Sequence, residues 1–139
     1  MIQRQYRRLR AVIIVVAGVV AATSLVACST SARRDGAVDV ARDFVAAVSA
    51  HDGDGACSLL TSDARESVTG ATNASCADAV VNVEERGATV GKVEVWGDSA
   101  QVHIGSDVVF LLRERAGWLV SAAGCTPQPD APYKCDVDG

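Results

Sequence analysis

The sequence predicts an α+β domain in which N-terminal helices pack on an antiparallel sheet of about four strands. Two observations favour this class. Apolar residues recur at every third or fourth position before Arg86-Gly87, as in amphipathic helices, and at every second position after it, as in strands. A run of helices followed by a run of strands is the order typical of α+β domains.

The first 27 residues are expected to be a secretory signal peptide, which takes no part in the fold. Four arginines at positions 4, 7, 8 and 10 precede an apolar run, and Leu25-Val26-Ala27-Cys28 follow it. This end of the run resembles a bacterial lipobox, in which the cysteine after the cleavage site receives two or three acyl chains. An uncleaved membrane anchor is the alternative, but the apolar run of about 16 residues is shorter than the ~20 that a spanning helix needs.

The lipobox predicts where the protein resides. We expect lipid on Cys28 to hold the protein at the extracytoplasmic face of the cell membrane. Residues 28–36 are small and polar, which predicts a flexible lipidated tether, and residues 37–139 then form a single α+β domain of about 100 residues. No cofactor is predicted.

The charge balance excludes one class of partner. Residues 1–27 hold four arginines and no acids, so the remaining chain has 9 Lys+Arg against 17 Asp+Glu. Such an acidic domain is not expected to bind nucleic acid or to lie flat on anionic lipid, since both need clustered basic residues. The adjacent pair Arg33-Arg34 is interpreted as solvated charge in the tether.

Cysteine usage agrees with export. Of five cysteines, Cys28 is assigned to lipid, which leaves an even number. Three pairings are open, and we favour Cys57 with Cys76 and Cys125 with Cys135, because local pairs close short loops. A metal site is the alternative, but close Cys pairs and a neighbouring His are lacking, so no metal is predicted.

The helices are predicted from apolar spacing and from their ends. Residues 37–50 place Val38, Ala41, Val45 and Val48 on one face, with Asp35 as N-cap and a stop at residues 51–53. Further helices are expected at 54–60 and 61–68, followed by a turn at 70–73. Ser75-Cys76-Ala77-Asp78 has the spacing of a capping box and opens a last helix.

The first strand pair is predicted to be a hairpin closed by Gly97-Asp98. A two-residue turn there sets Val93 opposite Val102 and Glu94 opposite Gln101, which places the apolar side chains on one face.

The second strand pair is predicted over residues 107–114 and 118–124. A three-residue loop at 115–117 sets Leu112 opposite Val120 and Phe110 opposite Ala122. Val109 and Leu111 make the other face apolar too, so this strand is either covered on both sides or exposed at a protein interface. The proline-rich tail, residues 126–133, is expected to be a surface loop that the second disulfide holds in place.

The mature part also resembles a known family. The residues that carry the likeness are Ala41-Arg42-Asp43-Phe44, Cys57-Ser58-Leu59-Leu60, Val93-Glu94-Val95-Trp96-Gly97, Val109-Phe110-Leu111, Ala123-Gly124-Cys125-Thr126-Pro127 and Cys135. In these positions the chain is similar to small actinobacterial lipoproteins of the nuclear transport factor two-like superfamily. The resemblance implies a curved sheet wrapped around helices as a cone with room for a cavity. It implies no activity, because related folds serve as isomerases, dehydratases, dimerisation modules and carriers.

Catalytic signals are weak. The first-hairpin register puts His103 opposite Lys92 and diagonal to Glu94, and a His with a carboxylate in a sheet-lined cavity is able to abstract a proton. A solvated cross-strand trio is the favoured interpretation. Residues 52–55 alternate Asp and Gly but lack the later ligands of an EF-hand loop, and no serine elbow or phosphate loop is present.

The sequence therefore predicts a non-catalytic accessory or binding role at the cell envelope, with an envelope protein or a second copy of the chain as partner. The candidate pocket or interface residues are Trp96, His103, Val109, Leu111 and Trp118. Trp96 is expected to be the most exposed, because it stands at a turn on the polar face. Two alternatives stay open: a carrier or sensor of a small apolar ligand in the cone, and an isomerase-like or hydrolytic enzyme that needs His103 to face inward.

Overall fold

The structure is a computed structural model that describes residues 29–84, 86–130 and 132–139. The chain divides into two compact units, Met1–Arg33 and Arg34–Gly139, and the account below concerns the second. The predicted signal peptide and the lipobox with Cys28 lie outside the described residues. Among the residues that are described, no helix has the length and apolar character needed to cross a membrane.

The second unit is α+β, as predicted. Residues 29–49 of the chain form a long helix, and the second unit begins within it, at Arg34. The helices that follow are α2 (Gly53–Ser58), α3 (Ser62–Thr72) and α4 (Cys76–Val80). The strands are β1 (Val90–Trp96), β2 (Ser99–Ile104), β3 (Asp107–Glu114), β4 (Gly117–Cys125) and β5 (Val137–Asp138). They form one five-stranded sheet in the order β1-β2-β3-β4-β5, and every neighbouring pair is antiparallel.

The fifth strand was not expected from the sequence. It has only two residues, and Val137 and Asp138 pair with Ala123 and Ala122 of β4. The disulfide between Cys125 and Cys135 returns the chain to the sheet just before this pairing. A strand of two residues is too short to show an alternation of apolar and polar residues, and only its contacts with β4 define it.

The long helix begins before the position that the sequence predicted. Residues 29–36, expected to be a flexible tether, are helical, so Asp35 is not an N-cap. Gly36 interrupts no helix here, since one glycine costs only about 1 kcal/mol relative to alanine. Because Gly36 has no side chain, Trp118 can pack closely against the helix; a Cβ at this position would lie 3.2 Å from Cδ1 of Trp118.

The helix ends where predicted, but with a residue other than glycine in the left-handed conformation. His51 has φ 57°. Its N–H donates to Val48 O, and the N–H of Asp52 donates to Ala47 O, at 2.9 and 2.8 Å. These two bonds satisfy carbonyls at the helix end in the Schellman arrangement.

Short polar side chains cap the three short helices. Asp52 accepts from Gly55 N, Thr61 accepts from Ala64 N, and Ser75 accepts from Asp78 N. The helix start predicted at Ser75 is therefore confirmed, with one of the two bonds of a capping box. In place of the second bond, from the Ser75 backbone N–H to the Asp78 side chain, Asp78 Oδ2 accepts from Ser75 Oγ at 2.7 Å.

The turn predicted at residues 70–73 is wrong. α3 continues through Gly70 to Thr72 and stops only at Asn73, which takes the left-handed conformation with φ 55°. Asparagine tolerates this conformation better than most residues, so it ends the helix without a glycine.

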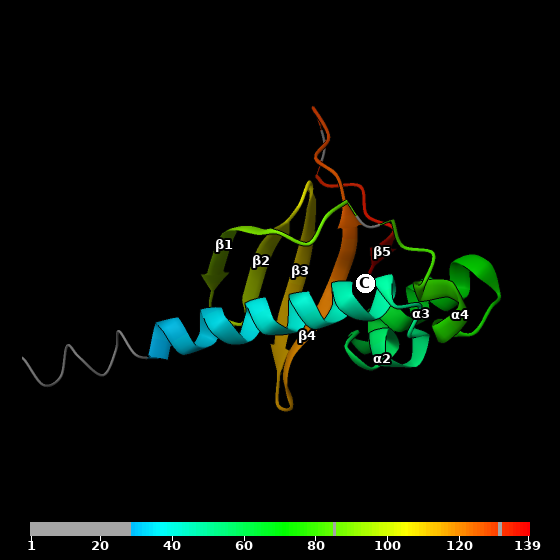
Figure 1. Ribbon diagram of the computed structural model, residues 1–139, viewed down its shortest axis with the longest axis horizontal. Helices are drawn as coiled ribbons and strands as arrows, with labels where there is room; N and C mark the ends of the chain where they lie inside the picture. Colours follow the sequence, from blue (N-terminus) through cyan, green and yellow to red (C-terminus); the bar gives the residue numbers. More distant parts are fainter. Residues whose placement is uncertain (1–28, 85, 131) are drawn as a thin grey trace, which may run out of the picture. The chain divides into compact units, whose positions relative to one another are not determined.

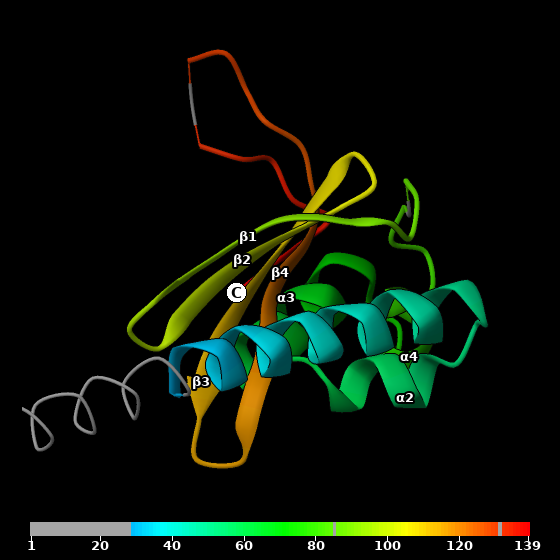
Figure 2. The ribbon, with the colours of Figure 1, turned by 60° about the vertical axis from the view of Figure 1, so that its left-hand side comes forward.

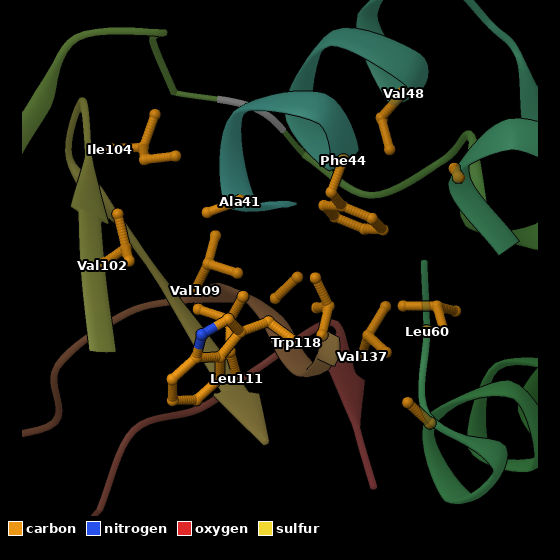
Figure 3. Close-up of a cluster of buried hydrophobic side chains, with 14 of the residues drawn as sticks. Ala41, Phe44, Val48, Leu60, Val102, Ile104, Val109, Leu111, Trp118 and Val137 are labelled. Carbon is orange, nitrogen blue, oxygen red and sulfur yellow. The ribbon is translucent and has the colours of Figure 1, made fainter. Parts of the chain in front are cut away.

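The helices and the sheet form two layers around one core. Figures 1 and 2 show residues 34–49 of the long helix crossing one face of the sheet, here called the inner face, with α2, α3 and α4 beside the β4–β5 edge. Backbone bonds join this edge to the helices, since Thr61 N donates to Val120 O and Val120 N to Leu59 O. Figure 3 shows the side chains that fill the space between the layers, among them Phe44, Leu60 and Val109.

The first hairpin has the predicted register from its turn to Val93, and an irregularity between Val90 and Val93 then shifts the pairing by one residue, where Lys92 was expected opposite His103. Val93 pairs with Val102 and Glu94 with Gln101, and the turn is Gly97-Asp98. Val93 and Val102 are buried, so the alternation of apolar residues does decide which face packs on the helix.

The second hairpin corrects the prediction in part. Glu114 pairs with Gly117 across a two-residue turn, and Leu112 pairs with Leu119 rather than with Val120. Phe110 pairs with Ala122 as predicted, because an irregularity between Phe110 and Leu111 shifts the register by one residue. The predicted three-residue loop is therefore wrong. The pairing derived from it is correct only for Phe110 and Ala122, which lie beyond the irregularity.

The strand β3 is covered on both faces over its first half. Val109 and Leu111 point into the main core and are 2 % and 1 % exposed. The opposite, outer face carries a second small cluster made by Val108, Phe110, Ala122, Cys125, Tyr133 and Cys135. In it the ring of Tyr133 meets that of Phe110 edge-on at a centroid distance of 5.1 Å. The proline-rich tail thus returns to cover part of the sheet.

Candidate binding surfaces

Both favoured disulfides are present. Cys57 and Cys76 join α2 to α4 with a Cα–Cα distance of 6.1 Å, and Cys125 and Cys135 join the end of β4 to the residues before β5 at 4.0 Å. Four of the five cysteines are therefore paired with one another. Cysteines paired in this way are typical of exported proteins.

His103 lies on the outer face of the sheet, since its neighbours Val102 and Ile104 are buried in the core. Its Nε2 is 3.1 Å from Gln101 Nε2, and that amide also donates to Tyr133 Oη at 3.2 Å. Within the described residues, the hydrogen-bonding partner of His103 is thus an amide rather than a carboxylate.

The predicted polar trio around His103 divides into two separate groups. Lys92 Nζ and Glu94 Oε1 pair with each other at 3.0 Å, and their side chains are 67 % and 42 % exposed. Such an exposed pair is worth at most about 1 kcal/mol. The hypothesis of an enzyme that uses His103 needs an inward-facing base, and this geometry does not provide one.

Three of the candidate residues lie in the core. Val109, Leu111 and Trp118 are 2 %, 1 % and 7 % exposed, and all three belong to the main cluster in Figure 3. The interior beside Val109 retains a void of about 10 Å³, bounded also by Phe44 and Ile104. A void of this size holds about one water molecule, so side chains fill the core around Val109.

A larger hollow lies outside the core, between the long helix and the sheet. It is an open groove of about 600 Å³, and the residues that line it are Arg42, Val45, Ala46, Ser49, Ala50, Ala88 and Ile104. Its walls are mostly apolar, and among the described residues that line it Arg42 is the charged one. The sequence did not reveal this groove. Val45 was assigned to the apolar face of the helix, the other helix positions looked like its flank, and Ala88 lies in a loop without a motif.

An ion pair fixes the loop that carries Ala88. Asp107 is only 7 % exposed, and it accepts from Arg86 Nη1 and from the Arg86 backbone N–H, both at 2.8 Å. Hydrogen bonds to Asp107 and then to Glu84 raise the pKa of Arg86 above its ordinary value, so the guanidinium is always charged.

Two backbone bonds complete this connection, from Ser106 N to Arg86 O and from Gly105 N to Thr89 O. One wall of the groove is thus anchored to the turn between β2 and β3. Arg86 and Asp107 are 21 residues apart in the chain, which is why sequence spacing gave no sign of the pair.

The outer face also carries an apolar row near the two hairpin turns. Trp96 and Leu112 are 52 % and 42 % exposed, and they are the exposed large hydrophobic residues of the described chain. Pairing places them in one row, since Trp96 lies opposite Ser99 and Ser99 lies opposite Leu112. Of the five candidate residues, Trp96 is the one that is strongly exposed, as expected for an aromatic residue at a turn on the polar face.

In the described part of the chain, no three His, Cys, Asp or Glu side chains gather closely enough to hold a metal ion. No known protein family, no curated protein and no solved structure matches this chain. The α+β class therefore stands on the structure itself, and the nuclear transport factor two-like identity stays a prediction.

Proposed function

We propose that the protein is lipid-anchored at the extracytoplasmic face of the cell membrane and that its domain binds a partner there without catalysing a reaction. The observation that supports this most directly is the use of the cysteines. Four of the five pair within the domain, and the fifth, Cys28, stands directly after Leu25-Val26-Ala27. Stable disulfides favour an oxidising compartment outside the cytoplasm, which is where a lipobox would direct the chain.

Binding is favoured over catalysis because the side chains that could act as acids or bases take part in structural contacts. Arg86 and Asp107 hold a loop, Lys92 pairs with Glu94, and His103 contacts Gln101. Within the described residues, the surfaces that we propose for a partner are the groove and the row that contains Trp96. The acidic balance disfavours nucleic acid, so an envelope protein or a second copy of the chain is the proposed macromolecular partner.

Replacing Cys28→Ser tests the anchor. The variant should move from the membrane fraction to the soluble or secreted fraction of the producing cells, and mass spectrometry should find no acyl chains on it. The physical reason is that each acyl methylene buried in lipid contributes about 0.8 kcal/mol to membrane binding. The serine carries no acyl chain, so the variant loses this contribution. Cys57→Ser is the matched control, because it is also a Cys-to-Ser change but opens a disulfide and leaves the lipobox intact, so the protein should stay acylated and membrane-bound. A Cys28→Ser protein that remains in the membrane would point to an uncleaved anchor instead.

A second candidate function is transport or sensing of a small apolar ligand. The groove favours it, because a volume of about 600 Å³ lies within the roughly 300–1,000 Å³ typical of ligand sites. Val45, Ala46 and Ile104 give it an apolar wall. The groove lies outside the core, so the ligand would bind between helix and sheet edge and not inside the cone that the sequence led us to expect.

Native mass spectrometry of the full-length protein, released from its own membranes in a mild detergent, tests this candidate. We expect a non-covalent added mass that disappears in Ala46→Trp, since the indole would fill the groove. Ala71→Trp is the matched control, because Ala71 is exposed on α3 and outside the groove. A wild-type protein without added mass, or an added mass that both variants keep, would contradict the ligand site.

A further inference from the structure

We infer that one end of the domain makes a second contact with the membrane that holds Cys28. This hairpin end consists of the turns at residues 97–98 and 115–116 together with the side chains of Trp96 and Leu112. The inference rests on the proposed lipid anchor. It adds that the domain stands on the bilayer in a defined orientation, with Trp96 and Leu112 among the lipid headgroups.

The topology brings the two turns and the two exposed side chains together. In an antiparallel sheet of order β1-β2-β3-β4, the β1–β2 and β3–β4 turns lie at one end and the β2–β3 turn at the other. Trp96 and Leu112 both pair with Ser99, so a single strand separates them, at about 10 Å. The exposed large apolar side chains of the described chain therefore form one patch on the outer face beside these turns.

The unit also begins at this end. Gly36 lies against Trp118, and Trp118 pairs with Arg113, two residues before the second turn. Arg34, the first residue of the unit, follows Cys28 after five intervening residues. The six steps along the chain span no more than ~21 Å, whatever their conformation. A lipid on Cys28 therefore keeps the start of the unit, and with it the hairpin end, close to the bilayer.

The distribution of charge favours the same orientation. Three basic residues at the hairpin end and the start of the unit balance three acidic ones; these are Arg34, Arg113 and Arg115 with Asp35, Asp98 and Glu114. The region from α2 to α4 is acidic, with Asp52, Asp54, Asp63, Glu66 and Asp78 against Arg65. Anionic lipid repels the acidic region but not the balanced end. The charge that disfavours lying flat is thus compatible with standing on the hairpin end.

The chemistry of the patch suits a bilayer interface better than a protein interface. Tryptophan concentrates at headgroup level, where its ring is partly in lipid and its N–H stays hydrated. One Trp and one Leu are far from the roughly 1,000 Å² that a stable protein interface buries. These two side chains are enough for a contact with the bilayer, because the lipid anchor already holds the domain beside it. A weak second contact is then effectively intramolecular.

This orientation has a consequence for the groove. The groove residues lie toward the other end of the long helix, and Ala46 follows Arg34 by twelve residues. At a rise of ~1.5 Å per residue this is about 18 Å along the helix axis. The groove would then be held away from the bilayer, where a partner or ligand in the surrounding aqueous space can reach it.

Tryptophan quenching in vesicles tests the orientation. The acylated full-length protein is reconstituted into vesicles of phosphatidylethanolamine and phosphatidylglycerol that contain a lipid brominated just below the headgroup. The chain holds two tryptophans, so Trp118→Phe leaves Trp96 as the only one, and excitation at wavelengths that tyrosine does not absorb reports on Trp96 alone. We expect brominated lipid to quench Trp96 severalfold more than aqueous iodide does, with a blue-shifted emission. If Trp118→Phe does not fold, the comparison of wild type with Trp96→Phe measures the same quenching by difference.

The matched control carries its tryptophan at the acidic region. Ala71→Trp in a chain with Trp96→Phe and Trp118→Phe should be quenched by iodide and not by brominated lipid. Flotation and mass spectrometry of the same samples report the anchor independently. Protein that lacks acyl chains and does not float overturns the proposed function.

Protein that floats, but whose Trp96 responds to iodide like the Ala71→Trp control, overturns only the orientation. A Trp96 shielded from both quenchers, in a sample that crosslinks as a dimer, assigns the patch to a protein interface and overturns the orientation as well.

Discussion

Val109→Lys should abolish the folded state, whereas Leu112→Lys, three residues later on the same strand, should change the free energy of unfolding by less than about 1 kcal/mol. Val109 is 2 % exposed on the inner face and Leu112 is 42 % exposed on the outer face. A lysine at the first position places an unpaired ammonium in an apolar core, at a cost of roughly 5 kcal/mol or more, which equals the whole stability of many domains of this size.

Urea denaturation followed by far-ultraviolet circular dichroism measures the difference. The two substitutions share the strand, the side chain introduced and the charge, and apart from the one methylene by which Leu exceeds Val they differ in the face of the sheet. If Val109→Lys folded and changed self-association instead, the inner face would be an interface and the core assigned to it would be wrong. If Leu112→Lys unfolded the protein, an additional layer would have to cover the outer face.

Cys57→Ser and Cys76→Ser should destabilise the domain equally, each by about 3 kcal/mol, because either change opens the same loop. The bond closes a sequence separation of 19 residues and holds α2 against α4. These helices have six and five residues, which is too short for independent stability, so the crosslink contributes much of what keeps them in place.

Denaturation of both single variants and of the double variant measures this effect. The double variant should lose no more than either single one, since the bond can be lost only once. Losses that differ between the single variants, or that add in the double variant, would show that the two cysteines act separately.

The two disulfides stabilise different parts of the domain. The first joins helices α2 and α4. The second, between Cys125 and Cys135, returns the tail to the sheet, where Tyr133 packs on Phe110 and Val137 enters the main core. The tail is therefore part of the fold although its proline content excludes it from regular structure over most of its length.

The sequence by itself determined the features that depend on short separations. Apolar spacing predicted the α+β class, Gly97-Asp98 predicted the register of the first hairpin, and Ser75 with Asp78 predicted a helix start. The disulfide pairing also followed, because both bonds close short loops. In each case the competing arrangements differ within a few residues, and local geometry or one periodic pattern separates them.

Only the tertiary structure decided the features that depend on contacts between distant segments. The face of β3 that is core was open in the sequence, because both faces are apolar and only the position of the long helix makes Val109 buried and Leu112 exposed. The irregularity that sets Leu112 opposite Leu119, and the pairing of β5, likewise arise from packing. Arg86 and Asp107 meet across 21 residues to fix one wall of the groove. Contacts between distant segments leave no periodic pattern in the sequence, so the residues that make them can be paired only in the folded structure.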